Sequence, residues 1–219
     1  ISNNVKKIIS LSTDKAVNPI NLYGATKLAS DKLFIAANNI VGKKKCLFSI
    51  VRYGNVVGSR GSVMEIFKKL SEKNKKIFPI TDFVMTRFWV SLEQTVEFVL
   101  LSLLRMQGGE IFVPKIDSIN IKDLVPAFNP NAKIKIIGLR PGEKIHEVLY
   151  SKEDSENTIE FSNFYIIKPQ IKFTTIKTNY FLTPLGEKGK KVKPGSEYNS
   201  FNNSSFLSFK EVKEMVKKY

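Results

Sequence analysis

Four side chains that can bind or release protons lie close together near the start of the chain. Asp14 and Lys15 end a short apolar run, and Tyr23 and Lys27 follow shortly after. Residues four apart share one face of a helix, so a helix here would place Tyr23 beside Lys27. Ionising a free tyrosine at neutral pH costs roughly 4 kcal/mol, and a neighbouring ammonium lowers that cost. The pattern predicts a Tyr-Lys base close to a carboxylate-amine pair.

Taken alone, each pattern also has an ordinary structural explanation. Many helices carry Tyr and Lys at this spacing by chance, and an Asp-Lys pair at a strand end can be an exposed ion pair. The segment Ser12-Thr13-Asp14-Lys15 also matches S-x-x-K, a serine acyl-enzyme signature. That chemistry requires a serine that opens a helix and a later K-T-G strand. Here Ser12 ends a predicted strand, and the later K-T-N differs from K-T-G.

Composition argues against several classes of function. Cys46 is the only cysteine and His146 the only histidine, so we expect no disulfide, no metal site and no histidine triad. The longest apolar run is too short to span a bilayer, and the first residues do not resemble a signal peptide. We therefore expect a cytoplasmic protein without membrane contact. The net charge of +15 comes mainly from scattered lysines rather than arginines interleaved with aromatics, so no nucleic-acid partner is expected.

Hydrophobic patterning predicts strands that alternate with helices. Residues 5–12 and 46–53 are expected to be buried strands, joined by a helix over 25–39. This alternation favours an α/β fold with a parallel sheet, with Asp14 and Lys15 at the carboxyl end of its first strand. Further helices are expected over 63–73, 91–106, 121–128, 142–150 and 209–218, and further strands over 110–113, 133–138 and 164–167.

Five segments, in this order, resemble a known family. Ser12-Thr13-Asp14-Lys15, Tyr23-Gly24-Ala25-Thr26-Lys27 and the RYGNVVGSRGS segment at 52–62 are similar to the extended short-chain dehydrogenase/reductases. The Asp-Lys pair within the first segment resembles the pair that nucleotide-sugar 4,6-dehydratases have at this position. The MTRFW segment at 85–89 and the RPGEK segment at 140–144 resemble the inverting UDP-N-acetylglucosamine 4,6-dehydratases that open pseudaminic acid synthesis.

The resemblance implies a Rossmann-like, doubly wound parallel sheet with a smaller α/β substrate-binding lobe. Residues 1–62 would be the C-terminal part of the NADP-binding domain. Residues 63–219 would be mainly the substrate-binding lobe, with about 91–115 returning to the first domain. Such enzymes begin with a Gly-rich turn that holds the dinucleotide, and neither G-x-G-x-x-G nor G-x-x-G-x-x-G occurs in this sequence. We therefore expect a fragment that lacks the first third of the family fold, binds NADP poorly and is inactive alone.

The resemblance also implies a reaction, the NADP-dependent 4,6-dehydration of UDP-N-acetylglucosamine with inversion at C5, which makes the enzyme a lyase. Tyr23 would remove the proton of the C4 hydroxyl, and Thr13 would hydrogen-bond the C4 oxygen. Lys15 would abstract the C5 proton while Asp14 protonates the departing C6 hydroxyl. Lys27 would hold the nicotinamide ribose and lower the cost of ionising Tyr23.

The remaining residues implied by the resemblance contact cofactor or substrate. Arg140 would bind a phosphate and Glu143 the ribose hydroxyls of the UDP-sugar partner. A salt bridge at a helix start is the structural alternative for this pair, and a tight glycine turn is the alternative for 55–60. The full-length form is expected to be a homo-oligomer, and a UDP-sugar 4-epimerase or a non-catalytic basic binding domain are the alternative functions. The cofactor contacts are Tyr23, Lys27, Val56, Val57, Gly58, Ser59 and Arg60, and the substrate contacts are Asn55, Val63, Thr81, Arg140 and Glu143.

Overall fold

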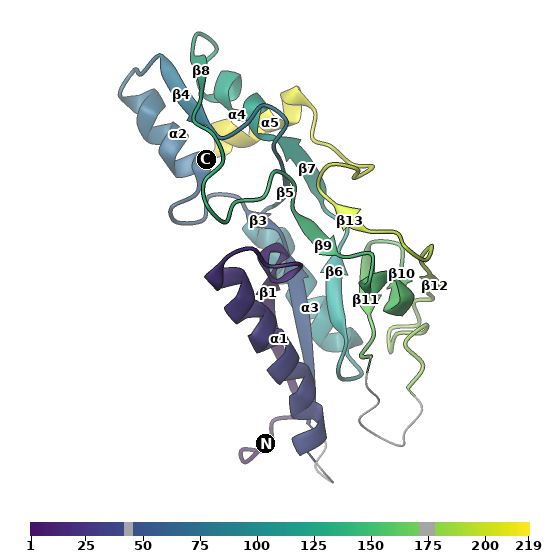
Figure 1. The fold of residues 1–219 in the computed structure, drawn as a ribbon. Coiled ribbons are helices and arrows are strands. Elements are labelled where there is room, and N and C mark those ends of the chain that lie inside the picture. Colours follow the sequence, from purple (N-terminus) through teal and green to yellow (C-terminus); the bar gives the residue numbers. More distant parts are fainter. Residues whose placement is uncertain (42–45, 171–177) are drawn as a thin grey trace. The chain divides into compact units, whose positions relative to one another are not determined.

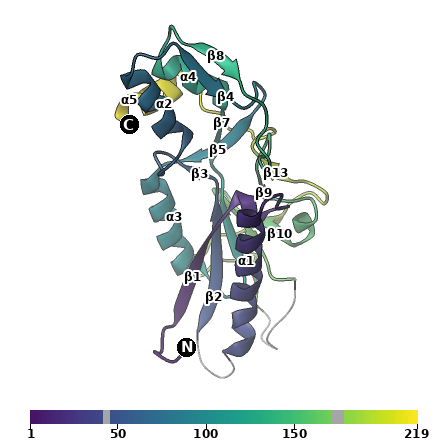
Figure 2. The ribbon, with the colours of Figure 1, turned by 60° about the vertical axis from the view of Figure 1, so that its left-hand side comes forward.

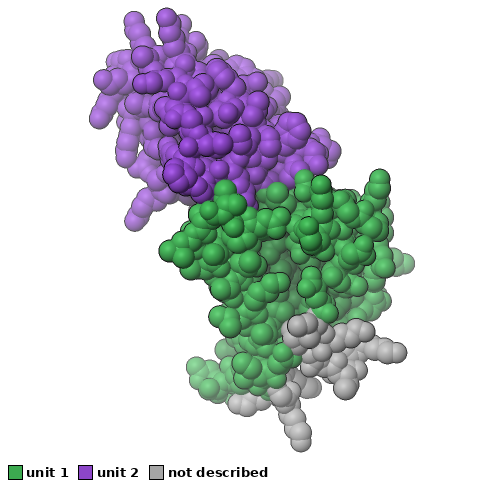
Figure 3. Space-filling view, in the orientation of Figure 1, with its two compact units in different colours: residues 1–53, 93–115, 148–198 green, residues 54–92, 116–147, 199–219 purple. Residues whose placement is uncertain are grey.

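The computed structural model describes residues 1–41, 46–170 and 178–219 (Figure 1). The chain forms two compact units, each assembled from three separate segments (Figure 3). Unit 1 comprises residues 1–53, 93–115 and 148–198, and unit 2 comprises residues 54–92, 116–147 and 199–219. Each unit therefore depends on contacts between segments that lie far apart in the sequence.

A six-stranded sheet forms the centre of unit 1. Its first three strands are parallel, and its last three add antiparallel pairings at one side. β1 and β2 pair in register from Lys7 opposite Leu47 to Thr13 opposite Tyr53, so their carboxyl ends lie side by side. In order across the sheet the strands are β1 (Lys7–Thr13), β2 (Leu47–Tyr53), β6 (Ile111–Pro114), β11 (Phe164–Ile167), β10 (Thr158–Glu160) and β12 (Lys190–Lys191).

Two helices cover opposite faces of the parallel strands, as Figure 2 shows. Alternate residues of a strand point to opposite faces. Ile8 and Phe48 lie in the apolar cluster that includes Phe34 of α1 (Leu22–Ile40). Ile9 and Val51, on the other face, pack with Phe98, Val99 and Leu103 of α3 (Leu92–Arg105). The short 3₁₀ helices η1 (Asp14–Ala16) and η2 (Asp154–Asn157) and the strand β9 (Val148–Tyr150) complete unit 1, and β13 (Tyr198–Asn199) spans its last boundary.

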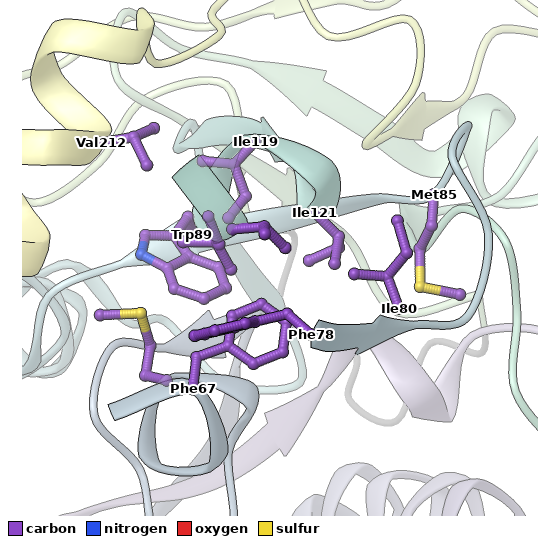
Figure 4. Close-up of a cluster of buried hydrophobic side chains, with 11 residues drawn as sticks. Phe67, Phe78, Ile80, Met85, Trp89, Ile119, Ile121 and Val212 are labelled. Carbon is purple, nitrogen blue, oxygen red and sulfur yellow. The ribbon is translucent and has the colours of Figure 1, made fainter. Parts of the chain in front are cut away.

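Unit 2 contains two small sheets and three helices around one apolar core (Figure 4). Trp89 of β5, Phe67 of α2 and Val212 of α5 all belong to this core. The Phe67 and Phe78 rings meet edge to face, with centroids 5.2 Å apart. The three-stranded sheet is β3 (Asn55–Val56), β5 (Thr86–Val90) and β7 (Asp117–Asn120), the parallel pair is β4 (Ile77–Ile80) with β8 (Lys133–Ile136), and the helices are α2 (Val63–Glu72), α4 (Ile121–Phe128) and α5 (Phe209–Lys218).

The predicted α/β fold with a parallel sheet is confirmed, and most predicted elements lie within a few residues of their observed bounds. Patterning missed the short strands β4, β5, β7 and β10. Among the described residues, no helix has the length and apolar content needed to cross a bilayer.

The helix predicted over 142–150 is wrong, because residues 148–150 form strand β9 and those before it are irregular. Distant groups bind the main chain there instead of helical neighbours. Arg87 donates to the carbonyls of Lys144 and Ile145, at 2.9 Å each. The amide of Ser200 donates to the Glu147 carbonyl at 2.8 Å.

The sequence assigned residues 1–62 to cofactor binding and 63–219 mainly to substrate binding. The compact units divide the chain after Tyr53, and residues 148–198 lie in the unit that contains β1 and α1. Which segments bind cofactor and which bind sugar stays a prediction.

A buried carboxyl group gives the stability of unit 1 a dependence on pH. Glu110 precedes β6 and is 1% exposed. Burial raises the pKa of Glu110, although hydrogen bonds from the Gln107 amide and the Ser49 hydroxyl oppose the rise. The folded chain therefore holds this proton more tightly than the unfolded chain. The resulting stabilisation is complete below the unfolded pKa of about 4.3 and is lost as the pH rises through the folded value.

Glu110→Gln removes this titration. Between about pH 4 and pH 8 we expect the free energy of unfolding of the variant to rise relative to that of the parent chain. Urea unfolding over a pH series measures this difference. Glu97→Gln, which removes one carboxyl group at an exposed position on α3, is the matched control. A pH-independent difference between Glu110→Gln and the parent chain would contradict the prediction.

Candidate active site

Three of the predicted catalytic residues are in mutual contact at the carboxyl end of β1. Thr13 is the last residue of the strand, and Asp14 and Lys15 open η1. The Thr13 hydroxyl donates to Asp14 Oδ1 at 2.8 Å, and Lys15 Nζ donates to the same oxygen at 3.0 Å. The Thr13 hydroxyl also accepts from the Lys15 amide at 3.4 Å, which caps the 3₁₀ turn. The turn itself thus holds hydroxyl, carboxylate and amine together.

The two charged groups of this turn differ in their access to water. The Asp14 side chain is fully buried, whereas that of Lys15 is 31% exposed. Asp14 Oδ2 is buried without a hydrogen-bond partner among the described residues. Burying a carboxylate is costly unless it is paired, and Lys15 and Thr13 satisfy only the other oxygen. Among the described residues, one oxygen of the Asp14 carboxylate is therefore paired and the other is not.

Tyr23 and Lys27 lie on the first turns of α1, as their spacing predicts. The Asn21 side chain caps the helix by accepting from the Gly24 amide at 2.7 Å. Lys27 Nζ donates to the Leu11 carbonyl at 2.7 Å, so this ammonium bridges α1 and β1. The Tyr23 side chain is exposed. Burial, and secondarily the charge of Tyr23, raises the pKa of Tyr53 at the end of β2.

Gly24 permits α1 to approach the catalytic turn closely. This glycine is buried, and a Cβ atom built on it would lie 2.2 Å from the Lys15 carbonyl oxygen and 3.0 Å from Pro19 Cβ. Atoms do not approach so closely, so any other residue here would push the helix away from η1. Gly24 thus fixes the separation between the helix that carries Tyr23 and the turn that carries Asp14 and Lys15.

The predicted cofactor segment 56–60 belongs to unit 2, where it follows Asn55 of β3. Asn55 pairs with Trp89 in the β3–β5 ladder, and its Oδ1 is buried without a partner among the described residues. Gly58 has a positive φ of 72°, and a Cβ on it would lie 2.5 Å from the Tyr219 ring. The tight glycine turn that was the structural alternative for 55–60 is therefore present. Its role in cofactor binding stays a prediction.

Thr81 and Glu143, two predicted substrate contacts, are joined in unit 2. The Thr81 hydroxyl donates to Glu143 Oε2 at 3.2 Å, and the Arg140 amide approaches the same oxygen at 3.4 Å. Arg87 Nη2 lies 3.6 Å from the other carboxylate oxygen. The Arg140 side chain is exposed, whereas Val63 opens α2 and packs against the apolar core. No helix starts at residues 140–144, so a salt bridge at a helix start, the structural alternative for Arg140 and Glu143, is not what holds Glu143.

The only histidine of the chain stands in the same segment. His146 Nδ1 and the Thr86 hydroxyl are 2.8 Å apart, and the Thr86 hydroxyl is 2.7 Å from that of the buried Ser200. The His146 ring lies against that of Phe201. Burial, followed by the charge of Arg87, lowers the pKa of His146. Residues 140–147 are thus held by hydroxyls and by the buried guanidinium of Arg87.

Thr13, Asp14 and Lys15 are connected in unit 1, and Thr81, Arg140 and Glu143 are connected in unit 2. The catalytic and binding roles of all the predicted site residues stay predictions. Within the ranges that the structure describes, no group of three or more His, Cys, Asp or Glu could hold a metal ion. The fold and the Tyr-x-x-x-Lys helix beside an Asp-Lys turn define a Rossmann-type protein.

The family is given by residues 1–169, which match the family described as polysaccharide biosynthesis protein. The chain belongs to this family. It is 58% identical over 214 residues to the UDP-N-acetylglucosamine 4,6-dehydratase (inverting) of Campylobacter jejuni subsp. jejuni serotype O:2, covering 98% of this chain and 64% of that protein. A UDP-glucose 4-epimerase of Rickettsia bellii is 39% identical, over 98% of this chain and 62% of its own length. The resemblance inferred from the sequence is confirmed, and the chain spans less than two thirds of each of these relatives.

Solved structures agree on the fold. The match to the X-ray structure of Pen from Bacillus thuringiensis has a TM-score of 0.83 and 30% sequence identity. It covers the whole of this chain and 64% of the Pen chain. A second match is to DesIV, a dTDP-glucose 4,6-dehydratase from Streptomyces venezuelae with NAD and TYD bound. This match covers 64% of this chain and 49% of the DesIV chain. Its TM-score is 0.56 at 18% identity, which shows a shared fold.

Gly24→Ala tests the close approach of α1 to η1. Alanine favours a helix interior by about 1 kcal/mol over glycine, so propensity alone predicts a gain in stability. We expect instead a loss of about 1–3 kcal/mol in the free energy of unfolding, because the Lys15 carbonyl must move. Urea unfolding measures it, with Ala29→Gly at an exposed position of the same helix as the control. A stabilised Gly24→Ala chain would show that the helix is free to shift.

Proposed function

We propose that this chain supplies the catalytic acid, the catalytic bases and the sugar-binding residues of an NADP-dependent UDP-N-acetylglucosamine 4,6-dehydratase that inverts C5. The contact of Lys15 Nζ with the buried Asp14 carboxylate, at 3.0 Å, carries this proposal. Dehydration of the sugar requires one group that removes a carbon-bound proton and one that protonates a hydroxyl. The identity to the Campylobacter jejuni dehydratase over nearly the whole chain supports the same reaction.

Oxidation at C4 comes first, because only a C4 ketone makes the C5 proton acidic enough to remove. When bound, a nicotinamide cofactor supplies the hydride exchange, at C4 and later at C6. In our proposal Tyr23 takes the proton of the C4 hydroxyl, and the Lys27 ammonium one helical turn away stabilises the phenolate. The Leu11 carbonyl holds that ammonium beside β1. The Thr13 hydroxyl hydrogen-bonds the C4 oxygen.

Elimination of water then uses the Asp-Lys pair. Transfer of one proton along the contact from Lys15 Nζ to Asp14 Oδ1 converts the ion pair into an amine and a carboxylic acid. The Lys15 amine takes the C5 proton, the C–H electrons form the C5=C6 double bond, and the C6 hydroxyl leaves as water with the proton of Asp14. The pair returns to ammonium and carboxylate, the ion pair present in the structure. Each proton transfer of this kind contributes about 10²–10⁴-fold to the rate.

Some residues of this chain fit the nicotinamide end of a cofactor. Lys27 keeps donors beyond the one bound to Leu11, and Tyr23 exposes its side chain, so both offer hydrogen-bonding groups of the kind that ribose hydroxyls bind. We propose that residues 56–60 line the same cofactor and that Asn55, Val63, Thr81, Arg140 and Glu143 contact the UDP-sugar. The DesIV structure contains NAD, and NADP for this protein is our proposal from the family resemblance. The G-x-G-x-x-G motif, whose backbone amides would bind the pyrophosphate of the cofactor, does not occur in the 219 residues.

A UDP-sugar 4-epimerase is the second candidate, supported by the 39% identity to the Rickettsia bellii enzyme. An epimerase returns the hydride to C4 and needs no acid at C6. The higher identity to the dehydratase and the Asp14–Lys15 contact favour dehydration. We further propose that the 4-keto-6-deoxy product enters pseudaminic acid or related surface-sugar synthesis.

Lys15→Ala tests the elimination step. The test protein is a chimera that joins this chain to the part of the Campylobacter jejuni relative that it does not cover. The variant should lose water release by about 10²-fold or more, because it removes the amine that contacts the Asp14 carboxylate. It should also lose the incorporation of solvent deuterium at C5, measured by mass spectrometry. Lys32→Ala, exposed on α1, is the control. Full dehydratase activity in Lys15→Ala would refute the assignment.

Tyr23→Phe tests the first oxidation in the same chimera. Loss of the phenol should abolish cofactor reduction, followed by the absorbance of the reduced nicotinamide, while UDP-sugar affinity stays within about threefold. The phenyl ring keeps the packing, so a loss of affinity alone would indicate binding rather than base catalysis. A normal rate of cofactor reduction would exclude Tyr23 as the base.

A further inference from the structure

A buried polar network in unit 1 links α1 to the ends of β1 and β2. The Ser12 hydroxyl donates to Asp31 Oδ2 at 2.8 Å, and Arg52 Nη2 donates to the same oxygen at 3.2 Å. Arg52 Nη1 donates to the Leu149 carbonyl at 3.1 Å and lies 3.9 Å from Asp154 Oδ2. One carboxylate oxygen of the helix therefore joins the residue before Thr13 to the residue before Tyr53.

The network is buried deeply enough to be costly. The side chains of Asp31 and Arg52 are 1% and 5% exposed, and Ser12 is 4% exposed. Asp31 Oδ1 and Arg52 Nε are buried without hydrogen-bond partners among the described residues. Desolvation of such a pair offsets much of its Coulomb attraction, so an apolar packing of similar volume would often be as stable. Stability alone is therefore a weak explanation for it.

Asp31 lies on the helix face that carries the proposed base. Tyr23, Lys27 and Asp31 are spaced at i, i+4 and i+8, so they occupy one side of α1. Burial increases along this face, from the exposed Tyr23 through the half-buried Lys27 to the fully buried Asp31. Lys27 binds the Leu11 carbonyl and Asp31 binds the Ser12 hydroxyl, so successive turns of α1 are bound to successive residues of β1.

We propose that Asp31, bound by Ser12 and Arg52, is a positioning residue that fixes the rotation of α1 about its axis and so places Tyr23 and Lys27 beside the Thr13–Lys15 turn. A rotation of α1 would displace the end of the Tyr23 side chain while leaving the helix intact. A misplacement of about 1 Å at a reacting group can cost about 10²-fold in rate. This inference rests on the proposed function for its catalytic consequence, but the placement of the helix can be measured without turnover.

Tyr53 reports on that placement in the chain as it stands. Burial in the cluster that contains Phe98 and Leu103 of α3 is the first cause that raises the pKa of Tyr53, and the charge of Tyr23 is the second; the second depends on where α1 places Tyr23. Asp31→Asn and Ser12→Ala should therefore lower the Tyr53 midpoint toward the free value of about 10, followed by NMR of chains with ¹³Cζ-labelled tyrosine. Ser12→Ala changes no charge, so a shift in that variant reports geometry. If Asp31→Asn fails to fold, the Tyr53 midpoint of Ser12→Ala alone tests the proposal.

Glu187→Gln is the matched control. Glu187 pairs with the buried Arg105 at 2.7 Å in the same unit, and the substitution also removes a carboxylate from a buried guanidinium. We expect Glu187→Gln to lower the free energy of unfolding without moving the Tyr53 midpoint. An unmoved Tyr53 midpoint in folded Asp31→Asn and Ser12→Ala chains would overturn the proposal.

Turnover in the chimera gives the second measurement. Asp31→Asn should lower kcat by about 10–100-fold and leave KM for UDP-N-acetylglucosamine within about threefold, whereas a purely structural role would lower kcat only with the folded fraction. A kcat that falls only with the folded fraction would refute the catalytic consequence. Absence of dehydratase activity in the parent chimera would refute the proposed function, and the Tyr53 titration would still decide the role of Asp31 in placing α1.

Discussion

The arrangement of unit 1 depends on how closely α1 can approach the turn that follows β1. At Gly24 the helix backbone lies against the Lys15 carbonyl, and there is no space for a side chain. This contact fixes one end of the helix, and the Lys27 and Asp31 contacts with β1 fix the turns that follow. A helix held at three successive turns has little freedom to slide or rotate. The position of the exposed Tyr23 is consequently determined by the contacts that Gly24, Lys27 and Asp31 of the same helix make.

Local sequence was informative where a few adjacent residues determine the geometry. The Asp14–Lys15 contact is made within one 3₁₀ turn, so adjacency in the sequence indicates that carboxylate and amine meet, whereas the Thr13 hydroxyl was implied by the family resemblance. The α1 helix was predicted from its spacing and loop signals, and its Asn21 cap agrees with them. The sheet followed from the alternation of strands and helices, because a parallel ladder requires a crossover between its strands.

Sequence patterning failed where distant residues supply the hydrogen bonds. The 142–150 segment has the residue types of a short helix, yet Arg87, nearly sixty positions earlier, binds its carbonyls. Asp31 was not singled out, although it stands four residues after Lys27 on the same face. The tertiary fold brings Asp31 into contact with Ser12 of β1 and Arg52 of β2. Burial of polar groups is a tertiary property, and short motifs contain no information about it.

The single histidine has a practical consequence for studies in solution. Because His146 is the only imidazole of the chain, its ring protons give one resolved pair of NMR signals with no assignment problem. Its contacts with the Thr86 hydroxyl and the Phe201 ring make those signals sensitive to the conformation of residues 140–147. Ligands that engage Arg140 or Glu143 can therefore be screened by observing a residue that they need not touch. The sequence thus contains its own spectroscopic reporter for the segment that we propose binds the UDP group.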